Sequence, residues 1–189
     1  MRMERWLARW ELVGIPVAVL TGSALHFAFE WSGYWKPLAL IAAVNESVWE
    51  HLKLAFWPSL LWALLGYATF RPNALAFFSA KGYALVVAPM LIVLIFYGYT
   101  ALLGRNFLGF DIAIFVIAIA AGQLASANLV EAGIRSSAKR LLGVGLLFCQ
   151  VVAYSTLTFY AQPYTLFEDE RNGIIGIPPR DNPPAVPFH

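Results

Sequence analysis

The stretch Asn45–Lys53 (NESVWEHLK) places two carboxylates, an imidazole, an amide, a hydroxyl and an ammonium between two strongly apolar segments. Ionisable groups near hydrocarbon are costly, so such a run needs either a structural or a functional reason. The rest of the chain has a composition suited to lipid. The stretch is therefore both the expected start of a polar helix and the first candidate for a functional site.

The composition outside this stretch indicates an integral membrane protein. Of the 189 residues, 60% are hydrophobic and 13% are charged, whereas a soluble domain of this size would need more polar surface. Aromatic residues make up 15%, including seven tryptophans, which is typical of proteins with two water–lipid interfaces. The net charge of +2 is too small and too scattered for a nucleic-acid partner. The expected partner is the lipid bilayer.

We predict an all-α fold, a polytopic transmembrane helical bundle over residues 1–161. Five segments approach the roughly 20 apolar residues that one membrane crossing requires, at about 12–29, 45–70, 82–103, 112–130 and 141–161. Residues 162–189 are predicted to form an irregular, Pro-rich tail outside the membrane, because they hold six of the eleven prolines. The tail either drifts in water or docks on the outer mouth of the bundle. Phe167 and three isoleucines favour docking.

Two of these segments allow alternatives. In the second, either a short re-entrant piece at Pro37–Val44 precedes a new helix at Asn45, or one long tilted helix projects from the membrane. The first segment resembles a cleavable signal peptide with small residues at Gly22–Ala24. Acidic residues at Glu4 and Glu11 and continued apolar character favour an uncleaved helix instead.

Lysine and arginine residues in the short loops predict the orientation. With the N-terminus in the cytoplasm, eight basic residues lie inside and four outside, which agrees with the positive-inside rule. We therefore predict an N-in, C-out protein with Asn45–Lys53 near the outer face. The inside set is Arg2, Arg5, Arg9, Arg71, Lys81, Arg135, Lys139 and Arg140.

Helical geometry gathers the polar side chains of Asn45–Lys53 on one face. At about 100° per residue, Glu46, Glu50 and Lys53 fall within a narrow arc, and Ser47 and His51 flank it. A structural explanation covers part of this pattern, since Ser47-x-x-Glu50 matches the capping box that begins many helices. It gives His51 no role.

The first segment supplies candidate partners for that face. Ser23, His26 and Glu30 are spaced i, i+3 and i+7, so they share one side of a helix, and Asp111 begins the fourth segment from the same end. Imidazoles and carboxylates together suit Zn²⁺, Mn²⁺ or Fe²⁺, and a bound metal can activate water for hydrolysis. The alternative for each histidine is a hydrogen-bonded packing role. The predicted metal ligands are His26, Glu30, Glu46 and His51, and the predicted catalytic residues are Glu46, Glu50 and His51.

The motifs also resemble those of a known family. His26-Phe27-x-x-Glu30-Trp31-Ser32-Gly33 and Val44–Leu54 are similar to motifs of small bacterial integral membrane proteins of unknown function, although that family has proline where this chain has Val44. Leu166–Asp169 and Gly173–Gly176 resemble an element at the end of the same proteins. The resemblance implies a multi-pass protein of the bacterial inner membrane, and it implies no activity.

Three classes of function remain open from sequence. The first is a membrane-embedded, metal-dependent hydrolase that acts on a lipid or small amphiphile. The second is a small transporter or ion-binding subunit, which would need a homo-oligomer because five helices enclose little pathway. The third is a non-catalytic scaffold or assembly factor. Motifs such as GxSxG, CxxC and a phosphate-binding glycine loop are absent from the sequence.

Overall fold

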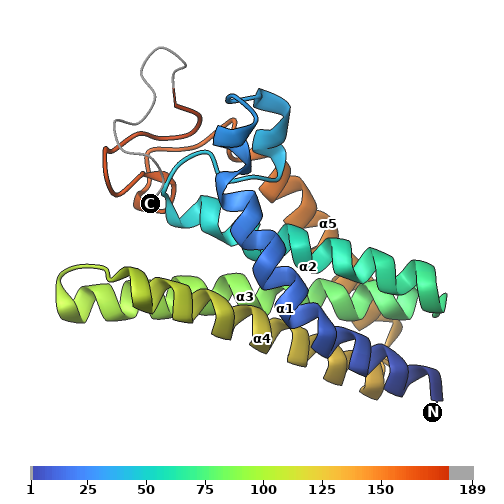
Figure 1. Cartoon of the computed structure of the whole chain (residues 1–189). Helices are drawn as coiled ribbons and strands as arrows, with labels where there is room; N and C mark the ends of the chain where they lie inside the picture. Colours follow the sequence, from blue (N-terminus) through green and yellow to red (C-terminus); the bar gives the residue numbers. More distant parts are fainter. Residues whose placement is uncertain (1, 179–189) are drawn as a thin grey trace.

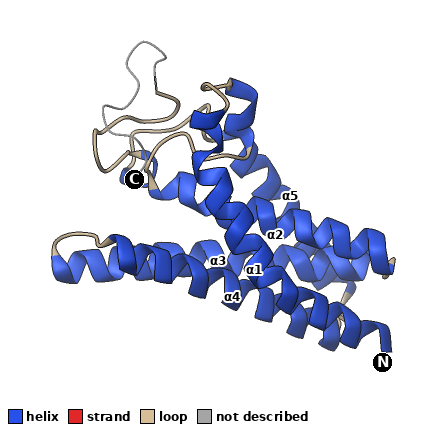
Figure 2. Cartoon of the chain, in the orientation of Figure 1, coloured by secondary structure: helices blue, strands red, loops and turns tan. Residues whose placement is uncertain are grey.

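A computed structural model describes residues 2–178, and within them the chain is all-helical (Figure 2). This part has five α-helices, two short 3₁₀ helices and no β-strand, apart from one isolated bridge between Glu168 and Ile175. The all-α prediction is confirmed. The elements are α1 (Arg2–Trp31), η1 (Lys36–Leu40), α2 (Val48–Phe70), α3 (Ala74–Leu103), α4 (Leu108–Ala132), α5 (Ser137–Thr156) and η2 (Thr165–Phe167).

Among the described residues, four of the helices are long and apolar enough to cross a membrane. They are Arg5–Trp31 of α1 and the whole of α3, α4 and α5. Helix α2 is not among them, because charged, imidazole and proline groups reduce its apolar character. Its 23 residues still measure about 35 Å, which is the length of one crossing. That α2 is the fifth span stays a prediction, as does the N-in, C-out orientation.

Large apolar side chains cover the outside of the bundle. Leu20 and Leu141 are each 72% exposed, Leu102 is 86% exposed and Phe148 is 68% exposed. Contiguous apolar surface of this kind is unfavourable in water but is the expected surface against lipid tails. The chain is a membrane protein by its surface as well as by its helix lengths.

The packing of the helices brings the predicted outer ends together. Helix α1 packs against α2 and α4, while α3 packs against α2, α4 and α5 (Figure 1). Consecutive helices run in opposite directions, so the end of α1, the start of α2, the end of α3 and the start of α4 lie at the end of the bundle away from the N-terminus. The main apolar core lies beneath this end and includes Phe56, Leu60, Leu85, Ala88 and Ile119.

The start of α2 resolves the alternative left open for the second segment. The chain forms the separate 3₁₀ helix η1, passes through a loop and begins a new helix at Val48. Ser47 caps this helix, since its Oγ accepts a hydrogen bond from the Glu50 backbone N–H at 3.4 Å. The predicted capping box is only half formed. The backbone N–H of Ser47 donates to Asn45 Oδ1 at 2.9 Å and leaves the Glu50 carboxylate for other partners.

Helix α3 begins at Ala74, eight residues before the predicted start of the third span at Gly82. Lys81 therefore lies inside the helix, where it is 1% exposed. Its Nζ lies 2.5 Å from Glu11 Oε1 of α1 and donates to Ser126 Oγ of α4 at 2.7 Å. This ion pair connects three helices and explains how a lysine is accommodated where sequence alone placed a loop.

The described part of the tail packs against the same end of the bundle, away from the N-terminus. Phe167 is 8% exposed and its ring lies 5.0 Å from that of Trp49, while Asn45 Nδ2 donates to the Gly176 carbonyl at 2.9 Å. The chain returns through a tight turn in which Asp169 and Ile174 are hydrogen-bonded at 2.9 Å. Residues 179–189 of the predicted tail lie outside the described residues.

We predict that Gly143→Ala destabilises the bundle, because α3 and α5 approach most closely there. A Cβ at Gly143 would lie 2.4 Å from the Ser79 carbonyl oxygen, and relieving such overlap costs about 1–3 kcal/mol. Gly145→Ala, in the same helix, is the matched control, since nothing lies within 4 Å of its Cβ position. Thermal unfolding of the purified variants in detergent should show a lower midpoint for the first variant alone. Equal midpoints would contradict the close α3–α5 packing.

Candidate functional site

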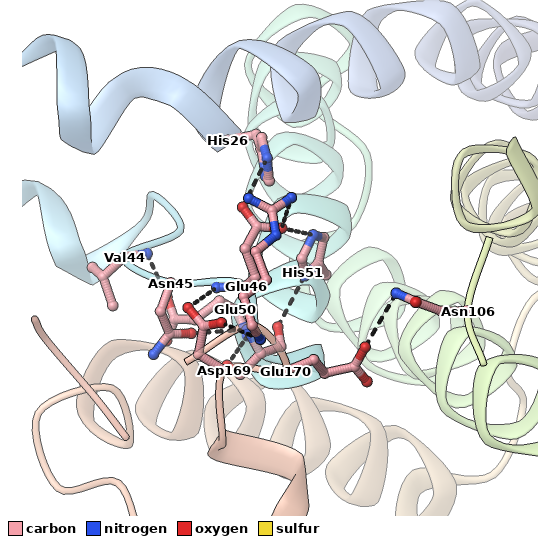
Figure 3. Close-up of polar contacts among 11 residues, drawn as sticks. His26, Val44, Asn45, Glu46, Glu50, His51, Asn106, Asp169 and Glu170 are labelled. Carbon is pink, nitrogen blue, oxygen red and sulfur yellow. Dashed lines mark hydrogen bonds and ion pairs between the residues drawn. The ribbon is translucent and has the colours of Figure 1, made fainter. Parts of the chain in front are cut away.

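Two histidines and a glutamate converge at the end of the bundle away from the N-terminus. His26 comes from the last two turns of α1, His51 from the first turn of α2, and Glu46 from the loop before α2 (Figure 3). The Nε2 atom of His26 lies 3.4 Å from Glu46 Oε1, and that of His51 lies 3.6 Å from Glu46 Oε2. The imidazole centroids are 5.3 Å apart. The structure therefore places three of the four predicted metal ligands in one group.

The ring of His51 has a fixed orientation. Its Nδ1 lies 2.9 Å from the Ser47 carbonyl oxygen, and because a carbonyl only accepts, Nδ1 carries the proton. The Nε2 atom that faces Glu46 then has either a second proton or a lone pair. In the neutral ring, a lone pair and a carboxylate face one another, which is unfavourable unless a cation or a proton lies between them. A backbone carbonyl behind the ring is the usual support of a metal-binding histidine.

The backbone of Glu46 is fixed by a hydrogen bond, and its carboxylate faces the two histidines. Its N–H donates to Asp169 Oδ2 of the tail at 3.1 Å. Among the described residues, its buried Oε1 has no hydrogen-bond partner, although buried carboxylate oxygens are nearly always hydrogen-bonded. Burial raises the pKa of Glu46, and the positive charges of His51 and Arg171 oppose that shift. Arg171 Nη2 lies 3.7 Å from Oε2.

The spacing of these atoms fits a shared metal ion. With ligand bonds of about 2.1 Å, tetrahedral ligands lie about 3.4 Å from one another, close to both histidine–glutamate separations. One ligand atom from each of the three residues can be chosen so that all lie within 4.8 Å of one another. The remaining pair, His26 and His51, is therefore no more than 4.8 Å apart, and side-chain rotation can shorten this separation to coordination distance. The group can therefore hold a divalent ion with two nitrogen ligands and one oxygen ligand.

Glu50, predicted as catalytic, has a different position. It is 1% exposed, and its Oε2 lies 2.6 Å from Lys53 Nζ and accepts from the Val44 N–H at 3.1 Å. Its Oε1 accepts from Thr158 Oγ1 at 2.7 Å. With both oxygens occupied, Glu50 joins a closed, buried network.

Lys53 completes this network. Its ammonium is fully buried and donates to the Ala39 carbonyl and to Thr158 Oγ1, both at 2.8 Å. Together with Glu50, these contacts satisfy all three of its donors. The network connects η1, the following loop, α2 and the turn after α5.

The other sequence candidates fall outside the histidine–glutamate group. Glu30, predicted as a ligand, is not part of it within the described residues. Asp111 lies instead in an adjacent cavity, where its carboxylate accepts a hydrogen bond from the hydroxyl of Tyr99. Tyr99 in turn accepts from the Phe107 N–H at 3.1 Å and so fixes the loop between α3 and α4.

A cavity of about 410 Å³ adjoins the group. Glu46 and His51 form part of its wall, so any ion held there borders the cavity. Its other polar residues come from the α3–α4 end and from the tail, and its apolar residues come from α2, α3 and α4. The volume is within the range of small-molecule sites. The lining residues are Glu46, Val48, His51, Ile92, Phe96, Asn106, Leu108, Asp111, Ile114, Phe115, Glu170 and Arg171.

Sequence reasoning favoured docking of the tail but missed the polar side chains that the tail contributes to the cavity. Glu170 Oε2 accepts from Asn106 Nδ2 at 3.2 Å (Figure 3), which connects the tail to the α3–α4 loop. Burial and the negative charge of Asp111 raise the pKa of Glu170. The charged run at 168–171 was visible in the sequence, but which of its side chains enter the cavity depends on the turn after Asp169.

Fold and site together define a helical membrane protein with two histidines and a glutamate grouped at one end of its bundle. The sequence model of a family of unknown function, DUF6512, matches residues 1–177, and the chain belongs to this family. The resemblance to an uncharacterised family is thereby confirmed. No curated protein and no solved structure matches the chain significantly.

The two neighbouring glutamates are predicted to respond differently to the same substitution. Glu50→Gln leaves the Lys53 ammonium buried without its counter-charge, and breaking a buried ion pair costs about 3–5 kcal/mol. Glu46→Gln removes a carboxylate that makes no side-chain hydrogen bond through Oε1. Unfolding midpoints in detergent should fall strongly for Glu50→Gln and little for Glu46→Gln. A similar loss in both variants would show that Glu46 is also structural.

Proposed function

We propose that this protein binds one divalent metal ion through His26, Glu46 and His51 and hydrolyses an amphiphile in the adjoining cavity. The observation that carries this proposal is the position of the group, since Glu46 and His51 line a cavity that has both polar and apolar residues in its wall. Three protein ligands and an open position are the usual composition of a catalytic zinc site. Zn²⁺, Mn²⁺ and Fe²⁺ all suit this ligand set.

The ion would supply Lewis acidity and a water of lowered pKa. The chain supplies orientation and proton transfer. Ser47 holds the His51 ring through its carbonyl, and Asp169 holds the Glu46 backbone. Asp111 and Glu170 are the cavity carboxylates outside the group, and we assign proton transfer to them. We give Glu50 no part in this role, because both of its carboxylate oxygens are occupied in the buried network with Lys53.

The transporter hypothesis requires a polar path to the opposite end of the bundle, and the described residues favour packing there. Gln150 of α5 donates to the Gly82 carbonyl of α3 at 3.0 Å, so it joins two helices. Below the cavity, Phe56, Leu60 and Ile119 belong to the apolar core. No observation gives the scaffold hypothesis comparable support.

We place the protein in the bacterial inner membrane with the group near the outer face. This placement rests on the family resemblance and on the distribution of basic residues between the loops. The cavity would then receive its amphiphile from the outer leaflet. A homo-oligomer is compatible with this arrangement, but the proposed reaction does not require one.

Purified protein is predicted to contain one divalent metal ion per chain. His26→Ala and His51→Ala should each reduce metal affinity more than about 100-fold, because removal of a direct ligand should exceed the 10–100-fold effect of its supports. Glu30→Gln serves as the control, since Glu30 lies outside the group. Elemental analysis and metal titration in detergent measure the occupancy.

Two outcomes would contradict metal binding. One is wild-type protein that takes up no Zn²⁺, Mn²⁺ or Fe²⁺ during titration. The other is equal loss of metal in Glu30→Gln and His51→Ala. A chelator should also lower the unfolding midpoint of the wild-type protein, since a ligand that binds only the folded state stabilises it.

Metal-loaded protein is predicted to cleave a membrane amphiphile. Incubation with mixed phospholipids and N-acyl amides, followed by mass spectrometry of released products, tests this step. Product formation should require metal and should be lost in Glu46→Gln, which is expected to remain folded. Failure of every substrate class with fully metal-loaded protein would contradict the hydrolase proposal and leave metal binding standing.

A further inference from the structure

The charges in the cavity are arranged in two regions. Arg171 and the histidine–glutamate group lie together, since Arg171 Nη2 is 3.7 Å from Glu46. Asp111 and Glu170 are the other two carboxylates that line the cavity, and they form its second, negative region. With a divalent ion in the group, the first region has net positive charge. A ligand that matches both regions has an anionic group and a cationic group a short distance apart.

The apolar wall of the same cavity continues onto the lipid-facing surface. Ile92, Phe96 and Ile114 are buried within the wall. Leu108 also lines the cavity and is 64% exposed. Nearby exposed apolar residues, Leu102, Leu103, Phe110 and Ile112, extend this surface outward. Leu108 therefore connects the apolar wall of the cavity to the exposed apolar surface, and we expect a hydrocarbon chain to reach the cavity there.

We propose that the cavity binds a membrane phospholipid whose headgroup bears an ammonium. The ammonium lies against Asp111 and Glu170, the phosphate faces Arg171 and the histidine–glutamate group, and an acyl chain lies along Ile92, Phe96 and Ile114. This assignment rests on the proposed function for its substrate class. The ammonium subsite depends only on residues outside the metal-binding group, so it can be tested without metal.

Lipid binding to the full chain tests this proposal. Native mass spectrometry in detergent compares phosphatidylethanolamine with phosphatidylglycerol of identical acyl chains, with chelator and with Zn²⁺. Glycerophosphoethanolamine, which has the headgroup alone, distinguishes a lipid ligand from a soluble one. Wild-type protein should prefer phosphatidylethanolamine about tenfold over phosphatidylglycerol, the size expected for one charge-assisted contact. The soluble headgroup should bind far more weakly than either lipid.

Asp111→Asn and Glu170→Gln should each reduce this preference to about threefold or less. Both amides keep an acceptor oxygen for Tyr99 or Asn106 and so preserve the observed hydrogen bonds. Glu131→Gln is the matched control, an exposed carboxylate at the far end of α4. It should leave the preference unchanged.

The outcomes separate the two proposals. Equal binding of both lipids by wild-type protein, or an unchanged preference in both cavity variants, overturns the ammonium subsite. Binding of the soluble headgroup as tightly as the lipid overturns the assignment of a lipid ligand. A phosphatidylethanolamine preference in protein that takes up no metal supports the subsite and contradicts the proposed metal-dependent function. Metal uptake without any headgroup preference supports the proposed metal binding and contradicts the ammonium subsite.

Discussion

The end of the bundle away from the N-terminus depends on how one buried lysine ammonium is satisfied. Lys53 lies fully buried on the second turn of α2, where an unpaired charge would be very costly. Glu50, Thr158 and the Ala39 carbonyl take its three donors, and Glu50 also accepts from the Val44 N–H. These contacts fix η1, the following loop and the turn after α5 relative to α2. The same loop contains Glu46. The Lys53 network therefore positions this candidate ligand, although Glu46 itself makes no contact in the network.

Two glutamates four residues apart thus have separate environments. Glu50 is enclosed by donors from three segments, whereas Glu46 faces two imidazoles and an arginine. Their spacing puts both on one side of an ideal helix, but α2 begins only at Val48. Glu46 is therefore in loop conformation, and its side chain turns toward α1. The boundary of a helix decides which of two identical side chains is available for chemistry.

The sequence was sufficient for the all-helical fold and for the meeting of His26, Glu46 and His51, because apolar length and loop spacing determine which helix ends adjoin. It did not reveal the burial of Lys81, since the lysine's partner Glu11 is seventy residues away and pairs with it only after α1 and α3 pack. For the same reason the roles of Glu170 and Arg171 were not predicted. The positions of these two side chains depend on one tight turn in the tail, and composition does not specify toward which part of the bundle such a turn directs its side chains.

The anchoring of the loop by the tail has a consequence for biosynthesis. Asn45 is hydrogen-bonded to Gly176, and the Glu46 backbone is hydrogen-bonded to Asp169. The loop and the tail, whose bonded residues are more than 120 positions apart, therefore satisfy each other's polar groups. The ribosome makes the N-terminal helices first, and domains generally fold in that order. The helices can insert and pack while the loop before α2 still lacks its final partners. The polar end consequently acquires its full set of contacts only after nearly the whole chain has been synthesised, which keeps an incomplete chain from presenting a finished site to the membrane.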